Sequence, residues 1–220
     1  MVPPLLRPAE HGRPSYDIKE PSAWDNIQPS AALVEAARDS TLVYGSLAQR
    51  ELSSRSTILR LKEVANRCVF DINLRPPFVY KEVVRQGAEG VWLLKVSDEE
   101  MAQVQEWFGL ENLQGKELAE ALQKELDVKN VVLTYGKNGA TLLSESGEYF
   151  THAGYSVSVA DTVGAGDAFL ATVLWELMCG TAGEDAIERA NAVGAWVTKQ
   201  SGATPAYTQA EVLKEIREQA

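Results

Sequence analysis

The stretch ADTVGAGDAF, residues 160–169, places a short glycine-rich turn directly before a run of helical periodicity. The first amides of a helix have no partner within it, and the helix dipole places partial positive charge there. Glycines remove the side chains that would keep an anion away, so the turn suits a phosphoryl group or a developing oxyanion. The apolar residues that continue the helical spacing up to Gly180 are Phe169, Leu170, Val173, Leu174, Leu177 and Met178.

Two aspartates flank this turn, Asp161 before it and Asp167 in the first turn of the expected helix. A carboxylate beside an anion pocket is unfavourable unless it acts on the incoming group, and removing the proton of an attacking hydroxyl is such a role. Asp161 is expected either to bind a cation or to orient the loop. A structural interpretation stays open, because both carboxylates would also stabilise a helix N-terminus by roughly 0.3–1 kcal/mol.

Outward from the turn, short apolar runs alternate with helical patterns, which is typical of βαβ units in an α/β domain with a parallel sheet. Ligands of such sheets lie at the carboxyl ends of the strands, so the residues that end the strands are candidate contacts. The expected strands are 41–45, 68–74, 90–97 and 130–136, followed by a hairpin around Gly147; the other expected helices are 53–66, one that begins with Ser97 as N-cap, 184–199 and 208–218.

Composition narrows the class of protein. The chain has 220 residues and a net charge of −10, which argues against a broad nucleic-acid or anionic-membrane surface. Cys68 and Cys179 have no zinc-site or disulfide-framework spacing, so a reduced, cytoplasmic setting is expected. No apolar run reaches the ~18 residues of a membrane span. Residues 1–30, rich in proline and polar groups, are expected to be irregular, and residues 31–220 to form the folded domain.

The string from Asp161 to Phe169, DTVGAGDAF, resembles the C-terminal signature of the PfkB, or ribokinase-like, family of carbohydrate kinases. The segments GSLAQR and DINLR are most similar to the fructokinase branch. The resemblance covers nearly the whole chain and implies a three-layer ribokinase-like fold with a mostly parallel sheet. The segments that follow in the family's order are YGSLAQR (44–50), FDINLRPP (70–77), LLKVSDEE (93–100), LTYGKNGA (133–140), ANAVGA (190–195) and SGA (201–203).

This resemblance implies an ATP-dependent transfer of the γ-phosphoryl group to a sugar hydroxyl. Asp167 would be the catalytic base and contact the sugar, and the amides of Gly164, Ala165 and Gly166 would form the anion hole. Asp161, with nearby backbone carbonyls, would bind a monovalent cation such as K⁺.

The resemblance also implies contacts along the nucleotide and the acceptor. Glu100 would act on Mg²⁺ through water, while Ser97, which replaces the family's asparagine, is also explained as a plain N-cap in a capping box. Asn73 and Arg75 would contact the acceptor sugar or the transferring phosphate, although a surface ion pair is the alternative for Arg75. The residues implied to line ATP are Lys95, Ser97, Thr134, Gly136, Gly139 and Asn191.

The family's sugar-binding aspartate, its Gly-Gly motif and its lid strands normally precede the segment GRPSYDI, and they do not occur in this sequence. An exposed sheet edge is therefore expected, together with access of water to the γ-phosphoryl group. The chain would then either be part of a longer kinase, or form a homodimer or bind another partner that covers the exposed edge.

Two functions stay open. One is a fructokinase-like sugar kinase, with fructose as the favoured acceptor, and the other is a non-catalytic nucleotide-binding or interaction protein. A dehydrogenase is disfavoured, because no G-x-G-x-x-G opens an early βα unit.

Overall fold

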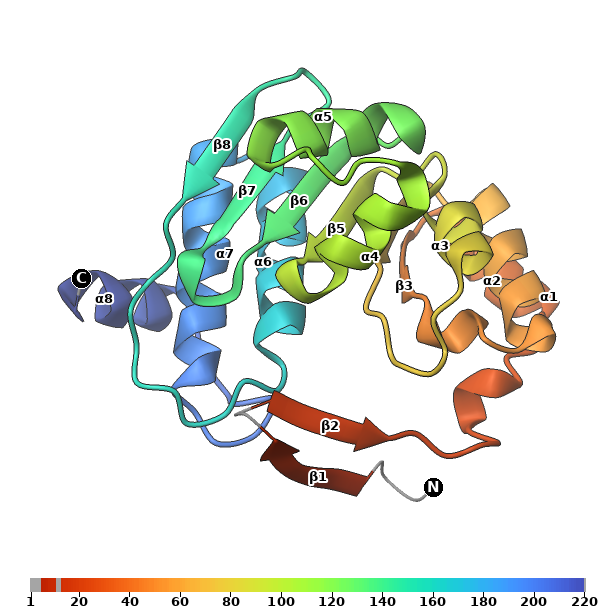
Figure 1. Ribbon diagram of the computed structural model, residues 1–220, viewed down its shortest axis with the longest axis horizontal. Helices are drawn as coiled ribbons and strands as arrows, with labels where there is room; N and C mark the ends of the chain where they lie inside the picture. Colours follow the sequence, from red (N-terminus) through yellow and green to blue (C-terminus); the bar gives the residue numbers. More distant parts are fainter. Residues whose placement is uncertain (1–4, 11–12, 220) are drawn as a thin grey trace. The chain divides into compact units, whose positions relative to one another are not determined.

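The computed structural model describes residues 5–10 and 13–219 (Figure 1). The chain divides into two compact units, Met1–Val131 and Val132–Ala220. Six strands form a mostly parallel sheet in sequence order, which confirms the α/β class that the sequence predicts. These strands are β3 (Thr41–Gly45), β4 (Arg67–Asp71), β5 (Leu93–Ser97), β6 (Asn130–Thr134), β7 (Ala140–Leu143) and β8 (Tyr149–His152).

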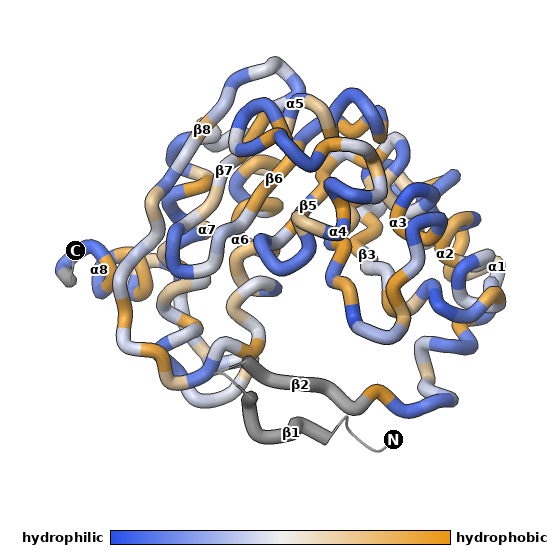
Figure 2. Tube along the Cα trace, viewed as in Figure 1, coloured by the Kyte–Doolittle hydropathy of each residue, from blue (hydrophilic) through white to orange (hydrophobic). Residues whose placement is uncertain are grey.

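In the unit Met1–Val131, β4 runs parallel to both β3 and β5. Val69 and Phe70 of β4 and Leu93 and Leu94 of β5 are fully buried. Strands that are covered on both faces consist of continuous apolar runs rather than alternating ones, and these two segments have that composition. In Figure 2, β6 is drawn in the orange of hydrophobic residues.

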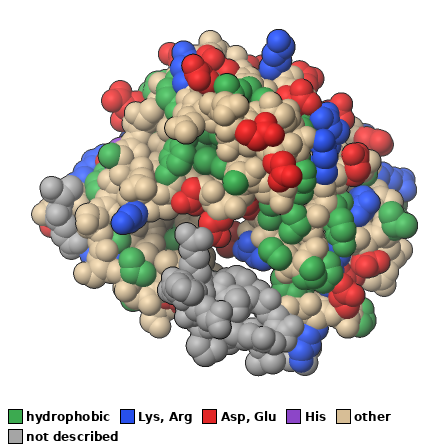
Figure 3. All heavy atoms as spheres, in the orientation of Figure 1, with side chains coloured by type: hydrophobic (Ala, Val, Ile, Leu, Met, Phe, Trp, Pro, Cys, Tyr) green, Lys and Arg blue, Asp and Glu red, His purple; other side chains and the backbone are tan. Residues whose placement is uncertain are grey.

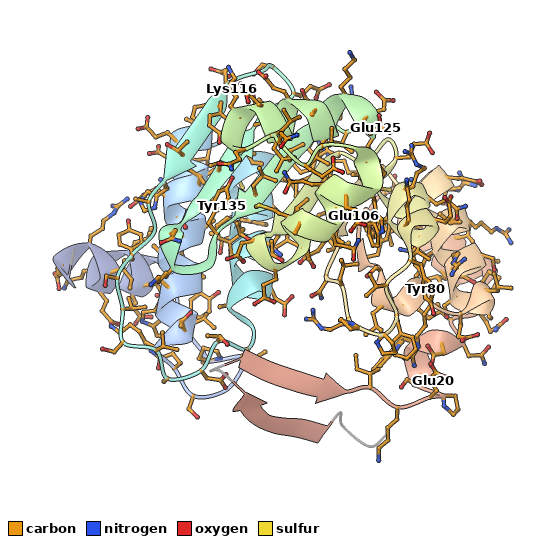
Figure 4. All side chains as sticks on the ribbon, viewed as in Figure 1. Glu20, Tyr80, Glu106, Lys116, Glu125 and Tyr135 are labelled. Atoms are coloured by element: carbon orange, nitrogen blue, oxygen red, sulfur yellow. The ribbon has the colours of Figure 1, made fainter. Side chains whose placement is uncertain are left out.

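The described residues of this unit form helices on either side of these strands in the chain, and local residues explain both ends of α4. Ser97 and Glu100 form the predicted capping box at the start of α4, and Gly109, at φ 71°, ends it. Arg85 of α3 donates to Glu125 at the end of α5, labelled in Figure 4, over 2.7 Å. The helices are α1 (Ala31–Arg38), α2 (Leu52–Val64), α3 (Lys81–Ala88), α4 (Asp98–Phe108) and α5 (Gly115–Glu125).

In the unit Val132–Ala220, β7 and β8 form the predicted antiparallel hairpin. Helices α6 (Ala165–Met178), α7 (Gly183–Thr198) and α8 (Gln209–Gln219) follow, with α7 packed on both α6 and α8. The buried carboxylate of Glu176 in α6 accepts hydrogen bonds from Thr181, from Arg189 of α7 and from Gln209 of α8. Burial raises the pKa of Glu176, but these donors outweigh it and the net pKa is lowered. One charged group thus joins all three helices.

The segment 1–30 was predicted to be irregular, and the structure differs. Strands β1 (Leu5–Glu10) and β2 (Arg13–Asp17) pair antiparallel in a separate two-stranded sheet, and a short 3-10 helix, η1, spans Ala23–Asp25. Proline lacks an N–H, but both strands of a two-stranded sheet are edge strands, where proline is tolerated. The proline content therefore does not exclude strands here.

Strand β4 ends at Asp71, three residues before the predicted end at position 74. Ile72 still bonds to both neighbouring segments, since its carbonyl accepts from the Ser46 amide over 3.1 Å and its amide donates to the Lys95 carbonyl over 3.2 Å. Asn73 then has φ 47°, and the chain turns away from the ladder there.

Strand β3 is an edge strand, because it comes first in the strand order of the sheet. Its Val43 is 49% exposed. This observation agrees with the exposed edge that the sequence predicts.

Acidic and basic side chains lie interspersed on the face drawn in Figure 3. Among the helices of the described ranges, none combines the length and the apolar character that crossing a membrane requires.

Candidate active site in two parts

The candidate residues fall into two groups, one in each unit, and each group is described by itself. In the unit Val132–Ala220, the glycine-rich turn leads into α6 as predicted. Gly164 is the N-cap of the helix and has φ 84°, in the left-handed region. A Cβ added to Gly164 would lie 2.3 Å from the Ala203 carbonyl oxygen, so only glycine fits between the helix and the backbone of the SGA segment.

The amides predicted for the anion hole are not equivalent. The Ala165 amide donates to the Thr162 carbonyl over a long 3.3 Å, and the Gly164 carbonyl accepts from Ala168 over 2.9 Å. Gly166 and Asp167 lie in the first turn of α6, where amides lack helical acceptors and the dipole is positive. The strongest anion-binding potential therefore lies at Gly166 and Asp167, next to the Asp167 carboxylate.

The two aspartates differ in their surroundings. Asp167 is exposed in the first turn of α6. Asp161 is half-buried, and its Oδ1 accepts from the Val163 amide over 2.9 Å, which fixes the turn from the inside. This hydrogen bond fits one of the two roles expected of Asp161, the orientation of the loop, and both roles stay predictions.

The residues of this unit that are predicted to contact the nucleotide lie in the turn that follows β6 and in α7. Thr134 ends β6, and the turn that follows closes through the Tyr135 amide, which donates to the Gly139 carbonyl over 2.8 Å; Tyr135 is labelled in Figure 4. Gly136 and Gly139 have φ of 54° and 86°. Asn191 is buried in α7 and donates to the Ile187 carbonyl over 2.7 Å, so its amide group is held by its own helix.

A Cβ on Gly139 would lie 1.9 Å from the His152 carbonyl oxygen. The turn after β6 is therefore packed tightly against the end of β8, and glycine is required there for close backbone approach.

In the unit Met1–Val131, Lys95 has a partner that sequence reasoning missed. Its Nζ lies 2.8 and 2.9 Å from the two carboxylate oxygens of Asp71, and both residues are buried. Asp71 and Lys95 are register partners in the parallel strands β4 and β5, which places their side chains together. Lys95, predicted to reach ATP phosphates, is held by this ion pair in the structure.

Ser97 and Glu100 lie where β5 passes into α4. Glu100 is 5% exposed, and its Oε2 accepts from the Ser97 amide over 2.9 Å. Its Oε1 accepts from the Leu74 amide over 2.7 Å, in the loop that follows β4. A carboxylate has about four lone-pair positions, so Glu100 keeps capacity for a water of a magnesium shell.

Asn73 and Arg75 lie in that same loop. Both are half-buried, and Arg75 donates to the Leu74 carbonyl over 2.9 Å. Phe78, which closes the turn by donating its amide to the Arg75 carbonyl, lies with its ring centroid 4.3 Å from the guanidinium carbon of Arg50. Arg50 in turn donates twice to Asp25 at 2.7 Å, and this bond lowers the pKa of Asp25.

Arg50 belongs to the segment GSLAQR, which sequence reasoning used only for the family resemblance. Its buried guanidinium supports the turn that carries Arg75. The sequence carries no signal for this role, because the burial of Arg50 and its pairing with Asp25 are visible only in the structure.

Comparison with known proteins defines the class. Residues 19–210 match the pfkB family carbohydrate kinase domain. The chain belongs to this family, and its α/β fold is the ribokinase-like fold of these kinases, as the sequence predicts.

The sequence identity between this chain and individual relatives is low. The chain is 30% identical over 157 residues to aminoimidazole riboside kinase of Salmonella typhimurium, covering 67% of this chain and 47% of that protein. It is 27% identical over 219 residues to probable fructokinase-3 of Arabidopsis thaliana, covering 91% of this chain and 62% of that protein. The chain thus spans about half to two thirds of the length of these two relatives.

Among solved structures, the chain is similar to fructokinase from Vibrio cholerae O395 with fructose, ADP and calcium bound. The TM-score is 0.76 and the identity 27%, over 97% of this chain and 72% of that one. Aminoimidazole riboside kinase from Salmonella enterica superposes with a TM-score of 0.68 at 22% identity, over 90% of this chain and 69% of that one, and supports the fold.

Proposed function

We propose that the chain carries the nucleotide and catalytic parts of an ATP-dependent sugar kinase. The observation that supports this best is the turn at the start of α6, where Gly164 packs against the Ala203 backbone and the exposed Asp167 carboxylate lies in the first helical turn, whose amides have no acceptor within the helix. Such an arrangement suits a transferring phosphoryl group together with a base for the attacking hydroxyl.

In the proposed reaction, Asp167 accepts the proton of a sugar hydroxyl. The hydroxyl oxygen then forms a bond to the γ-phosphorus of ATP, the bond from this phosphorus to the β–γ bridging oxygen breaks, and ADP leaves. The amides of Gly164, Ala165 and Gly166 stabilise the charge on the transferring group, with Gly166 best placed in the helical turn.

The remaining candidate residues bind and orient. Magnesium, when bound, supplies neutralising charge to the phosphates, and Glu100 would hold one of its waters. Asp161 would bind K⁺ with its second oxygen, and Asn73 and Arg75 would contact the sugar. The residues proposed to line ATP remain Lys95, Ser97, Thr134, Gly136, Gly139 and Asn191.

Fructose is the acceptor we propose. The Vibrio cholerae fructokinase, which binds fructose and ADP, matches nearly the whole chain. The aminoimidazole riboside kinase relative acts on a riboside, so ribosides form the natural comparison set. We also propose a cytoplasmic enzyme, since Cys68 and Cys179 are both free thiols.

The direct experiment is release of ADP by the purified chain with Mg-ATP, with and without fructose, other hexoses and ribosides. Turnover that depends on fructose supports the proposal. ADP release that no sugar or riboside increases, although ATP binds, contradicts it for this chain.

One observation favours a second candidate function, that of a nucleotide-binding or interaction protein without transfer activity. Val43 on the edge strand β3 is 49% exposed and Leu52 at the start of α2 is 74% exposed. Apolar side chains near an open strand edge suit a covering partner, which would be a second copy or another polypeptide. ATP binding without sugar-dependent turnover is the result that this candidate predicts.

A further inference from the structure

The loop that follows β4, residues 72–75, holds a strained backbone conformation next to the proposed acceptor residues. Asn73 has φ 47°. This left-handed region is unfavourable for residues other than glycine, although asparagine tolerates it best among them. Such a conformation persists only where the surroundings fix it, and it is enriched at functional sites.

Two neighbouring elements fix this backbone. Ser46, after β3, donates its amide to the Ile72 carbonyl over 3.1 Å, and its hydroxyl lies 3.4 Å from the Asn73 carbonyl. Glu100 of α4, which follows the loop in the sequence, accepts a hydrogen bond from the Leu74 amide over 2.7 Å. Of these contacts the bond to Glu100 is the shortest, and it is the one assisted by a negative charge.

The capping role of Glu100 explains only half of its contacts. A capping box requires one carboxylate oxygen, and Oε2 fulfils it by accepting the Ser97 amide. The other oxygen reaches a loop 26 residues earlier in the sequence. Glu100 is 5% exposed, so water competes little for either bond.

We infer that Glu100 is a positioning residue for the acceptor side of the site. It holds the Leu74 amide and thereby fixes the backbone that presents Asn73 and Arg75. This role is separate from any contact of Glu100 with a magnesium-bound water, and its catalytic meaning rests on the proposed sugar kinase function. The two roles differ in what they predict: loss of positioning weakens the sugar site, whereas loss of a metal contact changes the dependence on magnesium.

The variants Glu100→Ala and Glu100→Gln test this inference, with Glu99→Gln as the matched control on the exposed side of the same helical turn. Alanine removes both acceptors, whereas glutamine keeps one neutral acceptor oxygen. The first measurement is amide hydrogen exchange of residues 72–75, which needs neither activity nor ligand. We expect exchange at Leu74 to be about tenfold faster in Glu100→Ala, less affected in Glu100→Gln and unchanged in Glu99→Gln, as loss of a charge-assisted hydrogen bond implies.

The second measurement separates KM from kcat. We expect the KM for fructose to rise about tenfold in Glu100→Ala, with partial recovery in Glu100→Gln. Any change in the magnesium concentration for half-maximal rate reports the separate water contact proposed for Glu100, and the rise in KM is expected whether or not that concentration changes. Unchanged exchange at residues 72–75 in Glu100→Ala would overturn the inference, as would a shifted magnesium dependence at constant KM for fructose. Should Glu100→Ala fail to fold, exchange in the milder Glu100→Gln decides the question.

Failure of the proposed function would look different. Wild-type protein would then show no sugar-dependent turnover, while exchange at Leu74 would still respond to Glu100→Ala. In that case the loop is fixed by Glu100 but does not serve a sugar.

Discussion

The loop after β4 and the turn before α6 are built in contrasting ways. Around the first, the charged candidates are already engaged by the protein, with Lys95 bound to Asp71 and Glu100 bound to two backbone amides. Around the second, the helix presents amides and an exposed Asp167 carboxylate. Groups that must change their partners during a reaction are better left accessible, whereas groups that only orient others gain from being buried and paired. We therefore assign chemistry to the second region and orientation to the first.

The sharpest way to break this assignment is Asp167→Asn. Loss of a general base lowers rates by about 10²–10⁴-fold, so we expect sugar-dependent ADP release to fall about 10³-fold. ATP affinity, measured by calorimetry, should stay within a few-fold, because the amides of the turn remain. Asp185→Asn is the control, since Asp185 is exposed in the first turn of α7. Activity that survives Asp167→Asn would remove the base assignment.

Asp71→Ala tests the orienting region. It leaves the buried Lys95 ammonium without its carboxylate, and removing one partner of a buried pair costs about 3–5 kcal/mol. We expect the free energy of unfolding, measured with urea, to fall by about 3 kcal/mol. Glu120→Gln, which breaks the exposed pair with Lys116, should change it by less than about 0.5 kcal/mol. Equal effects of the two variants would show that the buried Asp71–Lys95 pair contributes no more to the free energy of unfolding than an exposed pair does.

Gly164→Ala tests how closely the turn is packed. Alanine at φ 84° costs about 1 kcal/mol or more for its conformation, and its Cβ would also meet the Ala203 carbonyl oxygen at 2.3 Å. Gly147 has the same φ of 84° with nothing within 4 Å of an added Cβ, so Gly147→Ala isolates the conformational cost. We expect Gly164→Ala to lower the free energy of unfolding by about 2 kcal/mol and Gly147→Ala by about 1 kcal/mol. If the two variants are equally stable, the turn adjusts away from Ala203.

The smallest expected effect is a pH dependence of the folding stability, which arises from His152 in the unit Val132–Ala220. Burial lowers the pKa of His152 below its ordinary value of 6.5, and the charge of Glu188 opposes this shift without cancelling it. The unfolded chain therefore binds a proton at higher pH than the folded one, so stability falls as the pH drops below about 6.5. We expect this fall to be shallower in His152→Gln than in the wild type, measured by thermal unfolding between pH 7 and 5. Parallel curves for the two proteins would contradict the expected titration.

The sequence predicts most of the second region because its features are local. The glycine turn, the helix behind it and the β7–β8 hairpin each depend on residues close together in the chain, and the structure has all three. Their site roles stay predictions.

The first region is less predictable because its contacts are not local. The pairing of Asp71 with Lys95 depends on the register of two parallel strands, and the bond from Leu74 to Glu100 spans 26 residues. The early end of β4 accompanies the left-handed backbone of Asn73, which apolar periodicity does not reveal, so the predicted end lies three residues too late. The strands β1 and β2 were missed because their prolines were read as evidence of irregular structure.

We propose that the amides at the start of α6 receive the transferring phosphoryl group. Amide resonances of Gly164, Ala165, Gly166 and Asp167 can be followed by NMR while the protein is titrated with Mg-ADP, aluminium fluoride and fructose, a mimic of that group in transfer. We predict that the Gly166 and Asp167 amides shift most strongly, and only when fluoride is present. Binding of the nucleotide without any shift at residues 164–167 would contradict the claim.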